Sequence, residues 1–145
     1  MNITTLNRPL WFAIVAIVLL IWNALGIFSF FAHTFISDEA LAALPAEESA
    51  LYGAYPFWTT VIFAIAVATG FIGALGLVLK KAWSKKAFII SLLAIIPQMI
   101  HNVFFTDAIV VYGMAEAVTM PILVVLLAVF ALSFSSYGIK KGWLA

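Results

Sequence analysis

The sequence contains no cysteine and very little charge. Of its 145 residues, 9% are charged and 66% are hydrophobic, whereas about a quarter of the residues in a typical soluble domain are charged. A soluble protein of this composition would expose large apolar patches and aggregate, so the composition indicates a membrane protein. The lack of cysteine excludes disulfides, thiolate metal ligands and cysteine nucleophiles.

Charged residues are missing altogether from four long apolar segments. Their approximate bounds are 10–31, 56–79, 87–105 and 119–139. Each is long enough to cross a hydrocarbon core of about 30 Å, which takes roughly 20 helical residues. Helix is the expected state, because lipid cannot satisfy free backbone polar groups. The sequence therefore predicts an all-α protein, an integral membrane four-helix bundle that forms a single transmembrane domain over residues 1–145.

The charges outside these segments are sorted by sign. The basic residues precede the first segment, separate the second from the third, or follow the fourth: Arg8, Lys80, Lys81, Lys85, Lys86, Lys140 and Lys141. The acidic residues lie in the two other connections: Asp38, Glu39, Glu47, Glu48, Asp107 and Glu116. Short loops rich in Lys and Arg stay in the cytoplasm, so both termini are predicted to be cytoplasmic.

The longest connection, residues 32–55, is predicted to be an outer loop with two short interfacial helices. Ser37 suits a helix N-cap and Pro45 suits a helix start, and acidic residues follow both in the first turn.

Short matches between the two halves favour two parallel helical-hairpin repeats. The matched features are Lys80–Trp83 (KKAW) with Lys140–Trp143 (KKGW), Asn23 with Asn102, and Pro56 with Pro121. Convergence is the alternative, because membrane helices share residues and basic-aromatic ends are common among them.

Polar side chains reach similar depths within two of the apolar segments: Asn23, Gln98, His101 and Asn102. The spacing of the last three places them on one helical face. We therefore predict an outward-facing polar cavity in which these four residues bind a small uncharged solute. The alternative is that they only join helices through hydrogen bonds, which contribute about 0.5–2 kcal/mol each.

Glycines recur within the second apolar segment, at Gly70, Gly73 and Gly76. They are predicted to allow close helix packing, within the bundle or between subunits. Because they lie inside an apolar segment rather than after a strand, they do not predict nucleotide binding. No nucleic-acid partner is expected. His33 and His101 differ in depth by about 10 Å along the helical rise, so no shared metal or haem and no other cofactor is expected.

Segments spread along nearly the whole chain carry a family resemblance: Trp22-Asn23-x-x-Gly26, Asp38–Pro45, Lys80-Lys81-x-Trp83, Gln98–Ile100 and Lys140–Trp143. With them the chain resembles a family of small bacterial four-span membrane proteins often labelled "sugar transporter", a family without a settled activity. The resemblance implies the bacterial inner (cytoplasmic) membrane. The Pro97-Gln98 pair is also similar to a dipeptide of small sugar-transporting bundles, which have three-helix units, and the general shape is similar to DoxX-like four-helix proteins.

Two functions stay open at this point. The protein either binds or carries a small uncharged solute, as a homodimer in the case of a carrier, or it is an accessory or structural membrane subunit with no ligand of its own. An enzyme is not expected, because no nucleophile–base pair, paired carboxylates or metal-ligand spacing occurs at one membrane depth. The apolar segments also lack the carboxylate on which proton-coupled antiporters of the small multidrug type rely.

Overall fold

The computed structural model describes residues 7–145, and within this range the chain is helical without any strand. Four helices are long: α1 (Leu10–Thr34), α4 (Phe57–Val78), α5 (Ser84–Phe104) and α7 (Met114–Lys140). Three are short: α2 (Asp38–Ala42), α3 (Ala46–Gly53) and α6 (Ala108–Tyr112). The predicted all-α class is confirmed.

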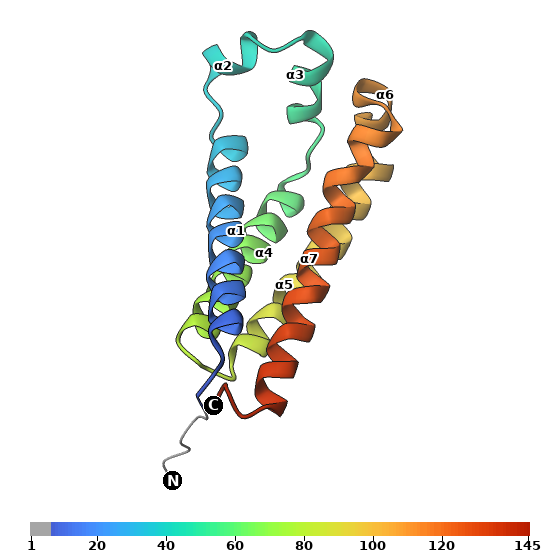
Figure 1. Ribbon diagram of the computed structural model, residues 1–145. Coiled ribbons are helices and arrows are strands. Elements are labelled where there is room, and N and C mark those ends of the chain that lie inside the picture. Colours follow the sequence, from blue (N-terminus) through green and yellow to red (C-terminus); the bar gives the residue numbers. More distant parts are fainter. Residues whose placement is uncertain (1–6) are drawn as a thin grey trace.

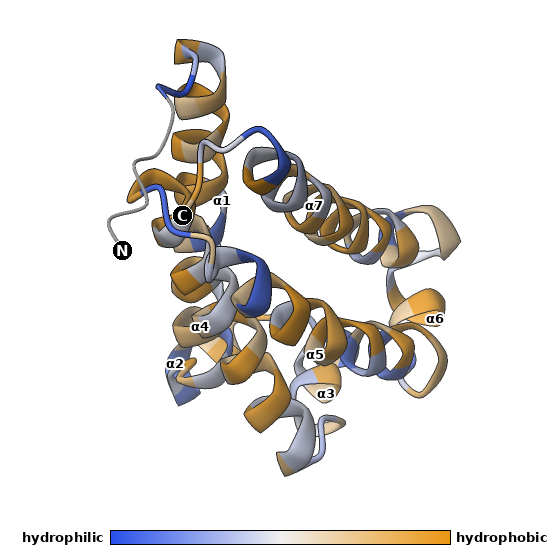
Figure 2. Cartoon of the chain, turned by 90° about the horizontal axis from the view of Figure 1, so that it is seen from below, coloured by the Kyte–Doolittle hydropathy of each residue, from blue (hydrophilic) through white to orange (hydrophobic). Residues whose placement is uncertain are grey.

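The four long helices have the length and surface of membrane spans. The shortest, α5, has 21 residues, which at about 1.5 Å per residue is enough to cross a hydrocarbon core. Apolar residues cover the outward faces of these helices, as Figure 2 shows, and many large ones are more than one-third exposed. This surface suits lipid rather than water, and the chain is a multi-pass integral membrane protein with a helical bundle.

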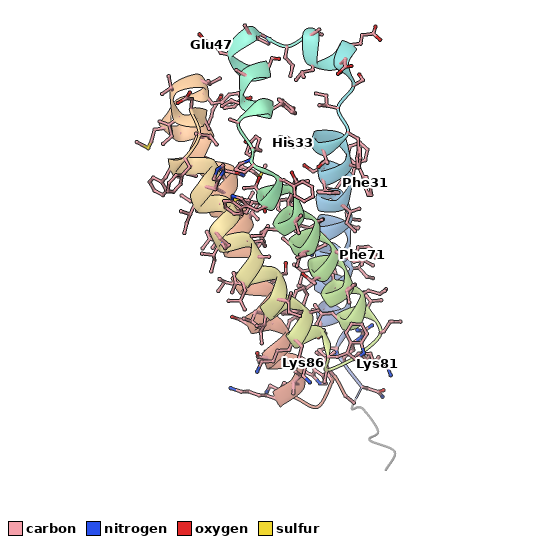
Figure 3. All side chains as sticks on the ribbon, turned by 180° about the vertical axis from the view of Figure 1, so that it is seen from behind. Phe31, His33, Glu47, Phe71, Lys81 and Lys86 are labelled. Atoms are coloured by element: carbon pink, nitrogen blue, oxygen red, sulfur yellow. The ribbon has the colours of Figure 1, made fainter. Side chains whose placement is uncertain are left out.

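The structure gathers the charges of each sign at opposite ends of the bundle. We call the end with Arg8, the α4–α5 turn and the end of α7 the basic end, and the end with α2, α3 and α6 the acidic end (Figure 1). Figure 3 shows Lys81 and Lys86 at the first and Glu47 at the second. The two short helices predicted in the outer loop are α2 and α3, and the Ser37 hydroxyl caps α2 by accepting a hydrogen bond from the Ala40 N–H at 3.1 Å.

Each long helix packs mainly against its neighbours in the sequence, in the order α1, α4, α5 and α7. The first and last of these, α1 and α7, meet at the basic end, where the rings of Phe12 and Phe134 stack with centroids 4.2 Å apart. Trp11 and Trp143 complete this aromatic cluster. From there α1 and α7 diverge toward the acidic end (Figure 1).

Glycines bring α4 and α5 into close contact. A Cβ atom built on Gly73 would lie 2.8 Å from the ring of Phe88, and one on Gly76 would lie 2.9 Å from the ring of Trp83. Both glycines are buried. The contact between α5 and α7 includes a buried hydrogen bond of 2.7 Å between the hydroxyls of Ser84 and Ser135.

The ends of α4 and α7 have the same backbone conformation, but not at the positions that the KKAW and KKGW segments align. Each helix is followed by one residue in the left-handed conformation, Lys80 (φ 60°) after α4 and Gly142 (φ 74°) after α7. In both, the next residue donates a backbone hydrogen bond to a glycine carbonyl five positions earlier, which is a Schellman motif. The structure thus equates Lys80 with Gly142, whereas the KKAW and KKGW segments equate Lys80 with Lys140.

The start of α7 also differs from the prediction. The helix begins at Met114 rather than near residue 119, directly after Gly113, whose φ of 83° reverses the chain between α6 and α7. Pro121 therefore lies inside α7, whereas Pro56 is the N-cap of α4. The apolar segment did not include the first turns of α7, because they carry the charged residue Glu116.

Candidate functional site

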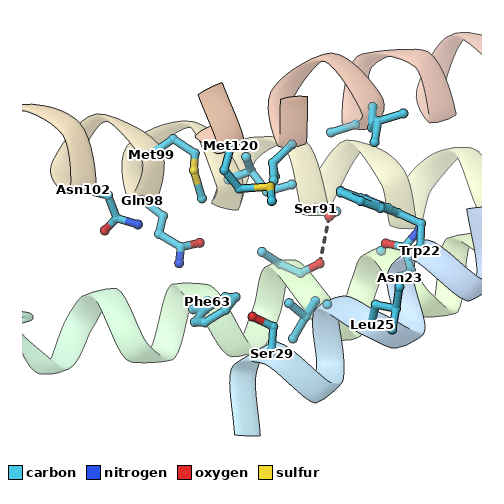
Figure 4. A pocket seen from close by; sticks show the side chains of 18 of the residues that line it. Trp22, Asn23, Leu25, Ser29, Phe63, Ser91, Gln98, Met99, Asn102 and Met120 are labelled. Atoms are coloured by element: carbon cyan, nitrogen blue, oxygen red, sulfur yellow. Dashed lines mark hydrogen bonds between the residues drawn. The ribbon is translucent and has the colours of Figure 1, made fainter. Parts of the chain in front are cut away.

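A cavity of about 510 Å³ lies between the four long helices. The helices α4 and α5 form its back wall, and α1 and α7 form its two sides (Figure 4). Apolar side chains make up most of the lining, and no charged side chain of residues 7–145 contributes to it. The volume lies within the range of about 300–1,000 Å³ that is usual for small-molecule sites.

Gln98 is one of the two amide residues that line this cavity from α5. It lies on α5, one residue after Pro97, and is 5% exposed. Its amide points into the space between the helices (Figure 4), and it forms no hydrogen bond to other groups within residues 7–145. The nitrogen and oxygen of this amide stay accessible from the cavity, which therefore holds an unused donor and acceptor.

Asn102 lies one helical turn farther toward the acidic end and also lines the cavity. Its carboxamide oxygen is buried and has no hydrogen-bond partner within the described chain. Gln98 and Asn102 are i,i+4 neighbours, so their side chains lie one above the other along α5. The two amides therefore lie next to each other at the cavity, although the Asn102 oxygen itself is enclosed by other atoms.

Asn23 lines the cavity from α1, but its amide is already engaged. Its Nδ2 donates to the carbonyl of Leu19 at 2.8 Å, and its Oδ1 lies directly against Gly70. Ser91 on α5 approaches the same glycine and donates to the carbonyl of Ala66 on α4 at 2.8 Å. This region of polar groups ties helices together and leaves less hydrogen-bonding capacity for a ligand.

His101 is separated from the other predicted binding residues. It does not line the cavity. Its ring packs instead against Trp58, edge to face at 5.3 Å, and stacks on Phe105 at 5.9 Å. Its Nδ1 atom is buried and has no hydrogen-bond partner among the described residues. The structure thus brings Gln98, Asn102 and Asn23 to one cavity and directs His101 to the adjoining α4 surface.

A cluster of rings lies at the acidic end of the cavity. His33 stacks on Tyr52 at 4.6 Å and meets the edge of Tyr55 at 5.2 Å. Tyr55 also approaches His101 at 6.2 Å, so it lies between the two histidines. Burial raises the pKa of the Tyr55 phenol, and the nearby Tyr112 and Tyr52 raise it further.

Several lining residues were not predicted from the sequence. Ser29, Thr60 and Trp22 contribute to the cavity although none was assigned a binding role. The mid-depth position of Trp22 was the one available signal, because membrane tryptophans favour the interface. Hydroxyls such as those of Ser29 and Thr60 give no such signal, since they also bond to their own helix backbone in spans.

The possible roles of the site follow from this chemistry. Within residues 7–145, no three His, Asp or Glu side chains come close enough together to hold a metal ion. The neutral amides and hydroxyls can form hydrogen bonds to an uncharged molecule, and the apolar walls can cover its hydrophobic part.

No protein-family model, no curated protein and no solved structure matches this chain.

Proposed function

We propose that this membrane protein binds a small uncharged molecule in the cavity between its long helices. The observation that carries the proposal is the Gln98 amide, which is almost fully buried, faces the cavity and has no partner in the described chain. A ligand in the cavity can form hydrogen bonds to this amide, so its own polar groups are not left without partners.

The accessory-subunit alternative explains other polar groups better than it explains these two. Ser84 with Ser135, and Ser91 with the Ala66 carbonyl, form hydrogen bonds between helices. Such bonds stabilise helix packing without a ligand. Gln98 and Asn102 form no comparable bond to another helix, so packing alone gives no reason for two amides at this depth.

The setting proposed for this function is the bacterial inner membrane, with the basic end in the cytoplasm. The family resemblance and the sorting of charges to the two ends support it. In this orientation the Gln98 end of the cavity lies toward the outer side. If the protein carries its ligand across the membrane, we propose that it does so as a homodimer, because four helices leave little room for a complete pathway. We propose binding or transport rather than catalysis.

The proposal predicts that Gln98→Leu abolishes ligand binding and that His101→Phe does not. Both residues are buried in α5, but only Gln98 faces the cavity. The measurement is the shift in thermal unfolding temperature of the purified protein in nanodiscs on addition of glucose or of monooleoylglycerol. A ligand at about 100 times its Kd stabilises the folded state by about 2.7 kcal/mol. We expect one of these probes to stabilise the native chain and the His101→Phe variant, and to have no effect on Gln98→Leu.

Thr69→Val is the matched control for lost polarity. Thr69 lies on α4 at membrane depth, bonds to its own helix and does not line the cavity, so its variant should retain the shift. A shift that persists in Gln98→Leu, or no shift with either probe, would contradict the proposal.

A further inference from the structure

The shape and lining of the cavity also bear on the class of ligand that it binds, and this inference rests on the proposed function. We propose that the cavity takes an uncharged single-chain lipid, such as a monoacylglycerol. The lipid enters sideways between α1 and α7 from the leaflet at the acidic end, and its chain points toward the basic end.

The sideways route follows from the arrangement of the two flanking helices. The stacked rings of Phe12 and Phe134 join α1 and α7 at the basic end, and the helices diverge beyond them (Figure 1). Leu25 on α1 and Met120 on α7 both line the cavity, and they are 58% and 56% exposed. The cavity therefore reaches the surface that faces lipid.

The water-facing end is more obstructed than this side. Three rings gather there, because His33 stacks on Tyr52 and contacts the edge of Tyr55. Above them α3 buries Leu51 and contacts α6. A molecule dissolved in the membrane thus has a less hindered way into the cavity than one dissolved in water.

The orientation of the ligand follows from where hydrogen-bonding capacity remains. Toward the acidic end, the Gln98 amide faces the cavity without a partner in the described chain, and Asn102 lines the cavity one turn beyond it. Toward the basic end, the walls include Phe88 and Ala131, and the amide of Asn23 already donates to the backbone of its own helix. A polar head would therefore bind beside Gln98, and an apolar chain would extend toward Phe88, parallel to the lipids of that leaflet.

The head group of the lipid must be uncharged, and the lipid must have a single acyl chain. No charged side chain of residues 7–145 lines the cavity, so an ionised head would lose its hydration without gaining a partner. The volume of about 510 Å³ is in the range of sites for one small ligand. These limits exclude the two-chain phospholipids of the bulk membrane as the specific ligand.

The test is photolabelling of the full chain in phosphatidylcholine vesicles with a monoacylglycerol that carries a diazirine near the end of its chain. We expect labelling at the wall near Phe88 and Ala131, and loss of that labelling when excess monooleoylglycerol is added. Ala128→Phe should reduce it at least tenfold, because Ala128 lines the cavity. Ala68→Phe adds the same volume to an exposed position outside the cavity and should leave the labelling unchanged.

Each alternative gives a distinct result. Labelling confined to outward residues such as Ile14 and Ile21, or not reduced by competitor, would mean ordinary contact with bulk lipid and would overturn the inference. So would a stable dimer in which a second copy covers the opening and prevents labelling. If Ala128→Phe unfolds, Gln98→Leu provides the second variant, and it should abolish the competition. A Gln98-dependent thermal shift with glucose alone would preserve the proposed function and refute the lipid, whereas no response to either probe would refute both.

Discussion

At the scale of single residues, Gly73 sets how closely α4 can approach α5. An alanine Cβ at this position would lie 2.8 Å from two ring carbons of Phe88, which is 3% exposed and has little room to move. We expect Gly73→Ala to reduce the free energy of unfolding by about 1–3 kcal/mol, the usual effect of overpacking. The measurement is unfolding in mixed micelles, followed by circular dichroism.

Gly26→Ala is the matched control for this substitution. Its Cβ would be 3.6 Å from the Val67 side chain, which is ordinary van der Waals contact. The same change should therefore leave stability unchanged or raise it slightly, because alanine favours helix over glycine. If both variants lost the same free energy of unfolding, the effect at Gly73 would not come from close packing against α5.

The residue scale also shows what the sequence could and could not predict. The i,i+3 and i,i+4 spacing correctly placed Gln98, His101 and Asn102 on one broad face of α5. That face is about 100° wide, and it is divided between two environments. Gln98 and Asn102 lie on the cavity side, whereas His101 lies against Trp58 of α4. The position of α4 relative to α5 decides which of the two environments each residue meets. The sequence of α5 alone does not specify that position.

At the scale of helices, Arg8 caps the end of α4. Its guanidinium donates to the carbonyls of Leu77 and Val78 at 2.6 and 2.9 Å. These carbonyls belong to the last turn, where the helix dipole favours a positive charge. We expect Arg8→Gln to lower the free energy of unfolding by about 1–3 kcal/mol, typical for hydrogen bonds to charged groups, in the same micelle assay.

Lys81→Gln removes an equal charge from the same end of the molecule. Lys81 is exposed, and its side chain forms no hydrogen bond within the described residues. This variant should change stability by less than about 0.5 kcal/mol. If the two variants behaved alike, the effect of Arg8 would come from net charge rather than from capping.

The existence of the four long helices was easier to predict than the residues at which they begin and end. The apolar segments identified the four spans because about 20 uncharged apolar residues have few other stable states. The start of α7 was misplaced because Pro121 suits a first helical turn, yet the chain holds it inside the helix. The short α6 was missed, since its five residues give no periodic signal.

At the scale of the whole molecule, the bundle was predictable and the cavity was not. The helices α1 and α7 are apolar on most sides, so no amphipathic stripe indicates which faces turn inward. The cavity exists because these two helices meet at Phe12 and Phe134 and diverge beyond them. This divergence depends on aromatic rings that are far apart in the sequence, and local patterns do not reveal such contacts.

The orientation of the whole molecule in the membrane can be tested by cysteine labelling, because the sequence contains no cysteine of its own. Ala43 at the acidic end and Ala145 at the basic end are both exposed, and replacing either with cysteine changes no charge. An impermeant maleimide should label Ala43→Cys in intact bacterial spheroplasts and Ala145→Cys only after lysis. The reason is that the Lys and Arg side chains gathered at the basic end resist translocation across the membrane. Labelling of Ala145→Cys before lysis would reverse the orientation, and the Gln98 end of the cavity would then lie toward the cytoplasm.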